Sequence, residues 1–144
     1  MFYLGEGMPQ LYLLSVILNG LTGFLFVFGE TEESDSVEKN VKVSIFDNRF
    51  RLVLGILTVV TGFLKLFLPY EGIPILGDFV PALAGIAGGF ILLFGFYKEH
   101  AENSSRESNL DRVGNTVLRY KKIVGFSLIA VSLLHFFFPA ALFL

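Results

Sequence analysis

Two ionisable residues lie near the ends of strongly apolar segments. Lys65 lies four residues before Pro69, and His135 lies four residues before Pro139. An amine or an imidazole can bind anions, carry protons or line a pore, and an ionisable group inside a spanning helix by default marks a functional site. So close to a helix end, the same groups can instead reach the lipid headgroups and act as interfacial anchors. Both interpretations stay open.

Acidic residues near the same ends of the apolar segments could balance these two groups. The natural counter-charges are Glu6, Glu71 and Asp78. We take Lys65, His135, Glu71 and Asp78 together as a candidate outer-face site or pore. No Asp or Glu lies inside an apolar segment, so a carrier of protons or cations that works through a membrane carboxylate has no obvious group to use.

A polar face is predicted on the first apolar segment. Ser15, Asn19 and Thr22 recur at i, i+4 and i+7, which places them on one face of a helix. That face would bond across helices in a bundle interior, or it would line a polar path.

Small residues gather in the third apolar segment. Gly85, Gly88 and Gly89 are the main examples, and Gly85 and Gly89 have the GxxxG spacing that lets helix backbones approach closely. The close contact could lie inside one chain or between copies in a homo-oligomer.

Enzyme motifs are absent from the sequence. There is no GxSxG elbow, HExxH pair, P-loop or GxGxxG turn, and without cysteine there is neither a disulfide nor a thiolate metal site. The two histidines, His100 and His135, are expected on opposite sides of the membrane and cannot share a metal. We therefore predict a protein that is not an enzyme and has no metal site or obligatory cofactor. Its net charge of −2 does not suggest a nucleic-acid partner.

The composition points to a lipid environment. Hydrophobic residues make up 53% of the 144 positions and charged residues 17%, with a mean hydropathy of +0.67. A hydrocarbon core of about 30 Å requires about 20 apolar residues per helix. Four stretches approach this length and are hydrophobic all round. They cover residues 8–28, 52–69, 79–97 and 123–144.

The charges predict an orientation. The two long connections, 29–51 and 98–122, hold every Lys and Arg except Lys65. The positive-inside rule then places both long connections in the cytoplasm, and both termini and the 70–78 turn outside. We expect a multi-pass protein of the cell (inner or plasma) membrane, with the lipid bilayer as its first partner.

The second long connection has helical periodicity of its own. Apolar residues recur at helical spacing beside a group of basic residues. Such a segment could form a short helix on an anionic inner leaflet. It could equally be a solvated linker that extends the last helix. The apolar residues are Leu110, Val113, Val117 and Tyr120, and the basic ones are Arg112, Arg119, Lys121 and Lys122.

The sequence also repeats itself. Residues 49–55 align with 119–125 at an offset of 70, and the alignment continues to LFLP at 66–69 and FFFP at 136–139. Around Gly23 and Gly95 the other two segments align at an offset of 72. We predict an all-α, integral membrane four-helix bundle in one domain, made of two tandem hairpins, about 4–69 and 76–139. Because each repeat holds two spans, the repeats are parallel and their pseudo-twofold axis follows the membrane normal.

Four runs resemble the DoxX-like membrane proteins: RLVLG at 51–55, GFLKLF at 62–67, GIAGG at 85–89 and LLFG at 92–95. The resemblance implies a four-helix bundle and, since some of that family belong to quinone-linked redox complexes, a bound quinone or lipid. An acidic residue that is common in the second matched helix is replaced here by Ile86 or Ala87. Related oxidoreductases that use paired cysteines are excluded.

Three functions follow as hypotheses. The first is a non-enzymatic assembly or accessory module, either self-associating or a subunit of a larger membrane complex. The second is a small transporter or channel with its site between the repeats, near Lys65 and His135. The third, from the resemblance, is a quinone- or lipid-binding redox accessory.

Overall fold

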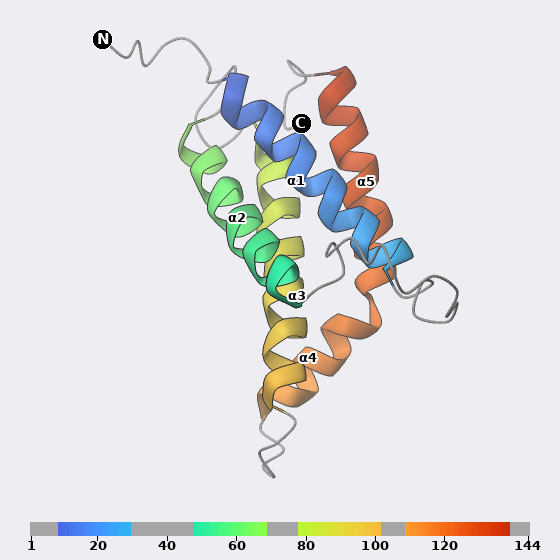
Figure 1. The fold of residues 1–144 in the computed structure, drawn as a ribbon. Coiled ribbons are helices and arrows are strands. Elements are labelled where there is room, and N and C mark those ends of the chain that lie inside the picture. Colours follow the sequence, from blue (N-terminus) through green and yellow to red (C-terminus); the bar gives the residue numbers. More distant parts are fainter. Residues whose placement is uncertain (1–8, 30–47, 69–77, 102–108, 139–144) are drawn as a thin grey trace, which may run out of the picture.

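The computed structural model describes residues 9–29, 48–68, 78–101 and 109–138, and this part of the chain is helical apart from single residues at helix ends (Figure 1). The all-α prediction is therefore confirmed for the described residues. The helices are α1 (Pro9–Phe28), α2 (Asn48–Phe67), α3 (Phe79–Ala101), α4 (Asn109–Arg119) and α5 (Lys121–Phe137).

Proline sets several of the helix boundaries. Pro9 begins α1, a first-turn position where its missing N–H is not needed. At the other end of a helix, the residue before a proline is disfavoured in the α region. Accordingly α2 ends at Phe67, two residues before Pro69, and Phe138, which precedes Pro139, has φ −128° and ψ 65°.

At three boundaries the helices extend beyond the sequence prediction, because polar residues extend apolar helices without interrupting them. The second helix begins at Asn48 rather than at 52, and the third continues to Ala101 rather than 97. The last predicted segment, 123–144, is described only as far as 138. Its helix, α5, begins two residues earlier than predicted.

Three helices of the described part are long and apolar enough to cross a membrane: Pro9–Phe28, Arg49–Phe67 and Phe79–Lys98. Their lengths of 19 or 20 residues agree with the thickness of a bilayer core. For these three, the prediction of helices long and apolar enough to span a membrane is confirmed. The α5 helix has 17 described residues and is about 25 Å long at about 1.5 Å per residue.

Polar and apolar residues are distributed in the reverse of a water-soluble bundle. Large hydrophobic side chains such as Ile17, Val60 and Phe126 are exposed, whereas polar side chains fill much of the interior. In water this arrangement would lose hydrophobic stabilisation, but in lipid the exposed side chains are solvated by hydrocarbon. The buried polar side chains are Ser15, Asn19, Thr22, Thr58, Thr61, Lys65, Asp78, Ser132 and His135.

The four long helices pack as two close pairs, α2 with α3 and α1 with α5 (Figure 1). Glycine permits both approaches. A Cβ atom on Gly89 of α3 would lie 2.5 Å from Val59 Cγ2, and one on Gly23 of α1 would lie 2.8 Å from Ile129 Cγ1. In each pair there is therefore no room for a side chain at the crossing point.

The two pairs make matching contacts. A Cβ on Gly62 in α2 would meet the Ala82 carbonyl oxygen of α3 at 2.8 Å, and Ser132 of α5 donates a hydrogen bond of 2.8 Å to the Val16 carbonyl of α1. Ser132 of α5 thus corresponds to Gly62 of α2, 70 positions earlier in the sequence. Ala82 of α3 corresponds to Val16 of α1, 66 positions earlier. The offset for α1 and α3 thus differs by six residues, nearly two helical turns, from the 72 expected from sequence identities.

The connecting helix α4 is distinct from α5. Of the two alternatives left open for this connection, the structure has the short helix, which ends at Arg119, and the chain changes direction between α4 and α5 (Figure 1). It packs against α3, because Gly114 lies against the Phe94 ring and Lys98 donates a hydrogen bond to the Asn115 amide oxygen. The segment is therefore more than a linker that extends α5.

Candidate functional site

One end of the bundle gathers a polar residue from each long helix. Lys65 lies in the last turn of α2 and His135 in the last turn of α5. Asp78 lies directly before α3, and Tyr12 lies in the first turn of α1. Because neighbouring helices run in opposite directions, the starts of α1 and α3 meet the ends of α2 and α5. We call Lys65, Asp78 and His135, with Tyr12 beside them, the polar cluster.

The three ionisable groups of the polar cluster are in mutual contact. Lys65 Nζ lies 3.3 Å from Asp78 Oδ2, and His135 Nε2 lies 3.6 Å from Asp78 Oδ1. The two nitrogens, Lys65 Nζ and His135 Nε2, are 2.5 Å apart. All three residues are only 1–2% exposed. Such groups are stable away from water only when each is matched by a partner.

The contact between the two nitrogens restricts their protons. A hydrogen bond between Lys65 and His135 requires one nitrogen to donate and the other to accept. The donor can be a Lys65 ammonium facing a neutral imidazole, or the imidazole N–H facing a neutral amine. An ammonium at Lys65 Nζ and an N–H at His135 Nε2 cannot be present together while this contact lasts. A further proton would break the contact and change the positions of the side chains.

Tyr12 holds the end of α5 in place. Its hydroxyl donates to the carbonyl oxygens of His135 and Phe136, at 2.8 and 3.1 Å. Its ring meets the imidazole edge-on, with centroids 4.8 Å apart, and lies 5.5 Å from Lys65 Nζ. The ring face attracts the cation while the hydroxyl fixes the turn that carries His135. Tyr12 was not among the residues selected from the sequence.

The structure brings together three of the four residues predicted at this end. Lys65, His135 and Asp78 meet, whereas Glu71 lies outside the described residues, as does Glu6. Neither the lysine nor the histidine extends to the surface as an anchor would. Asp78 lies before the first residue of α3, in agreement with the expectation that no Asp or Glu lies inside an apolar segment, but its carboxylate is buried beside Lys65 and His135 and so gives a proton carrier an acidic group.

Below the cluster, the polar face predicted on α1 points into the bundle. Ser15, Asn19 and Thr22 are all buried. Asn19 Nδ2 donates to the Pro81 carbonyl at 3.0 Å, and the Thr22 and Thr58 hydroxyls are 3.3 Å apart. With Thr61 and Ser132, these residues form a polar column that leads from the cluster into the interior.

The predicted glycines of α3 are buried against other helices of the same chain. A Cβ on Gly85 would lie 3.0 Å from Asn19 Oδ1, and one on Gly88 would lie 2.8 Å from Leu128 Cδ1. Gly89 packs on α2, as described above. These positions serve packing within the chain. No group of three or more His, Cys, Asp or Glu side chains in the described part is arranged to hold a metal ion.

Comparison with known proteins places the chain in a family. A protein-family model matches residues 8–135. The chain belongs to that family. It is also 30% identical over 138 residues to an "Uncharacterized protein" of Treponema pallidum (strain Nichols), an alignment that covers 95% of this chain and all of the relative. The family match contains every residue of the polar cluster and ends at His135. No solved structure matches the chain.

Proposed function

We propose that this protein is a small membrane transporter that carries protons and whose proton-binding site is the polar cluster. The observation that carries the proposal is the burial of Lys65, Asp78 and His135 in mutual contact between three helices. Ionisable groups are expensive in a membrane interior and usually mark ion pathways or proton relays there. A purely structural bundle would be simpler with apolar side chains at these positions.

The proposal includes the membrane architecture. The chain crosses the membrane four times as two tandem hairpins, with α5 as the fourth span and the polar cluster near the outer face. The matching contacts at offsets of 70 and 66 support a pseudo-twofold relation between the hairpins. Lys65 and His135 are equivalent at the offset of 70, so the cluster lies between the repeats, where transporters often bind their substrates.

A carrier fits the described interior better than an open pore. The polar column provides hydroxyl and amide groups for part of the depth of the bundle. Beyond it, Leu25, Leu54 and Leu92 are packed in the apolar core. Protons therefore need a rearrangement of this layer to pass, which is the behaviour of a transporter that alternates between two states.

The assembly hypothesis is left with fewer observations in its favour. It drew partly on the small residues of α3, and contacts within the chain account for Gly85, Gly88 and Gly89. An exposed apolar surface remains on every long helix, but lipid tails can cover it.

Proton flux into liposomes tests the proposal. Purified protein is reconstituted with the pH-sensitive dye pyranine inside, and a pH gradient is imposed. We expect the wild type to dissipate the gradient faster than protein-free liposomes do. A triple variant with Lys65→Met, Asp78→Leu and His135→Leu removes the site without leaving an unpaired charge, so it should fold and lose the flux.

The control is Arg112→Met, which removes one cation from the exposed face of α4 and should keep the flux. Thermal unfolding in detergent establishes that all variants are folded. Wild-type flux in the triple variant would show that the cluster is structural. A wild type no faster than empty liposomes would remove the proton-transport function itself.

The orientation can be tested without altering native cysteines, because the chain has none. Gln10→Cys and Arg112→Cys place single thiols at exposed positions on opposite ends of the bundle. In intact cells, a membrane-impermeant maleimide should label position 10 and reach position 112 only after permeabilisation. The reverse labelling would place the polar cluster at the cytoplasmic side.

A further inference from the structure

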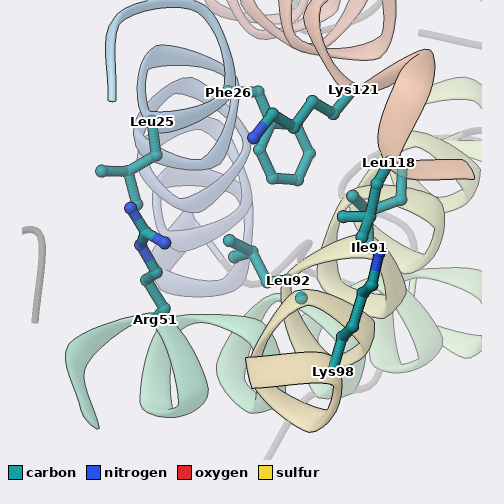
Figure 2. Close-up of a pocket in the computed structure, with 9 residues that line it drawn as sticks. Leu25, Phe26, Arg51, Ile91, Leu92, Lys98, Leu118 and Lys121 are labelled. Atoms are coloured by element: carbon teal, nitrogen blue, oxygen red, sulfur yellow. The ribbon is translucent and has the colours of Figure 1, made fainter. Parts of the chain in front are cut away.

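An apolar groove of about 370 Å³ lies between α3 and α5. Its lining residues come from the first half of α3 and from the first two turns of α5. The cavity shown in Figure 2 is a different space, and the described residues that line it, among them Arg51, Lys98 and Lys121, are all different from those of the groove. Since α3 and α5 belong to different close pairs, an occupant of the groove contacts both pairs.

Small side chains at three positions leave the space open. Ala84 and Ala87 of α3 and Ser127 of α5 all line the groove. The offsets of 66 and 70 relate this side of the bundle to the side formed by α1 and α2. At the equivalent positions there, the residues are Leu18, Leu21 and Leu57. Leucine is bulkier than alanine or serine, so the hollow comes from residues in which the two sides of the bundle differ.

The groove is suited to an apolar occupant. The polar side chain among its described lining residues, that of Ser127, donates its hydroxyl proton to the Ile123 carbonyl oxygen at 3.0 Å, so this donor is already satisfied within α5. The α3 part of the lining lies in the segment Phe79–Lys98, which is long and apolar enough to cross a membrane. The solvent at that depth is hydrocarbon, and a hollow left empty loses dispersion contacts.

The groove is long and narrow. Leu128 lies level with Gly88, since a Cβ on Gly88 would be 2.8 Å from Leu128 Cδ1. The lining extends from this level back to Phe79 on α3 and, because α5 runs the opposite way, back to Ile123 at the other end. At about 1.5 Å per residue this gives a length of about 20 Å, more than the thickness of about 15 Å that one leaflet contributes to the hydrocarbon core. A volume of about 370 Å³ over that length is much too narrow for an α-helix, whose diameter is about 10–12 Å.

We propose that this groove binds one acyl chain of a membrane phospholipid. The methylene groups of the chain lie against Ala84, Ala87 and Ser127, and the exposed side chains of Leu83 and Ile123 flank it. Dispersion contacts from several sides hold this chain more firmly than lipid that touches the convex surface of a helix. The proposal rests on the membrane placement given above, but it does not depend on proton transport.

Photo-crosslinking in vesicles measures the occupancy. The full chain is reconstituted in phosphatidylcholine that contains a small fraction of the same lipid with a diazirine in the middle of one acyl chain. After irradiation and proteolysis, mass spectrometry compares the label on residues 79–87 and 123–128 with that on the equivalent face, residues 13–21 and 53–58. We expect roughly fivefold more label in the groove, because many small dispersion contacts add up there.

The variant that fills the groove is Ala87→Leu with Ser127→Leu, which introduces the residue type of the equivalent face. Both positions are exposed, so the fold should be kept. The control, Ala130→Leu, adds bulk at an exposed position of α5 that does not line the groove. The filled variant should carry no more label on α3 and α5 than on the equivalent face, and the control should keep the wild-type ratio.

Equal labelling of the two faces in the wild type would overturn the site, since it would show ordinary lipid contact. A filled variant that keeps the wild-type ratio would have the same meaning. Low labelling of the groove that rises when the protein is diluted in lipid would assign the groove to a second copy of the chain instead. Labelling of neither face would overturn the membrane placement itself, and the lipid site with it.

Discussion

At the end of the α2·α3 pair, Lys65 faces Asp78, whereas the corresponding positions of the α1·α5 pair hold His135 and Tyr12. The correspondence uses the offsets of 70 and 66 that relate the contacts of the two pairs. Further along, Gly62 in one pair is matched by Ser132 in the other. The two pairs therefore share a backbone arrangement but carry different polar side chains at the end of the bundle.

The difference shows how few charges such a cluster tolerates. One pair supplies an amine and a carboxyl group in contact, and the other supplies an imidazole and a phenol. A second ion pair at the equivalent positions would require two more desolvated charges, and desolvation can exceed the electrostatic gain. The imidazole and the phenol instead contribute groups that can accept, donate or hold a proton.

Breaking the charged pair should have the largest effect. Asp78→Asn keeps the shape of the side chain but leaves the Lys65 amine buried without its anion. We expect a loss of about 3–5 kcal/mol in the free energy of unfolding. Unfolding by SDS in mixed micelles measures it. A loss below about 1 kcal/mol would mean that Lys65 does not depend on the carboxylate.

The glycines at the two crossing points should give an intermediate effect, and a similar one in both pairs. Gly89→Ala and Gly23→Ala each place a Cβ within 3 Å of the facing helix. Overpacking of this kind costs about 1–3 kcal/mol. In the control, Gly95→Ala, the nearest atom is Leu118 Cδ2 at 3.8 Å, so that variant should be tolerated. A marked difference between Gly89→Ala and Gly23→Ala would break the equivalence of the pairs.

The pair of Tyr12 and His135 should give the smallest effect. Tyr12→Phe removes the hydroxyl that bonds to the carbonyls of His135 and Phe136, but it keeps the ring beside Lys65. A net loss of about 1 kcal/mol is typical of such a hydrogen bond. The same SDS titration checks it. A loss as large as that of Asp78→Asn would show that both pairs are equally critical.

Much of the site could be found from the sequence because its residue types are costly in lipid. Lys65 and His135 were evident against their apolar surroundings, and Asp78 followed as a counter-charge. Tyr12 was missed because a tyrosine at a helix end is also what an interfacial belt contains. Tyr12 occupies the position in the α1·α5 pair that Asp78 occupies in the α2·α3 pair. This equivalence could have identified Tyr12, but it depends on the offset of 66 residues between α1 and α3, which is evident only from the helix contacts.

The fold was predictable to a similar extent. Hydrophobicity and proline located the long helices to within a few residues, because both act locally along the chain. The pairing of the helices is not local. It depends on which glycine faces which carbonyl, and matches between Gly23 and Gly95 suggested an offset that the close contacts of Gly23 and Gly89 do not follow.

Only Tyr120 separates α4 from α5, so the joint between them has little slack. A change in the tilt of α4 therefore also turns or shifts the start of α5. Leu118 and Lys121, on either side of this joint, both line the cavity shown in Figure 2, at one end of the bundle, whereas His135 lies in the last turn of α5, at the other end. A ligand that displaced α4 would therefore also displace the first turn of α5.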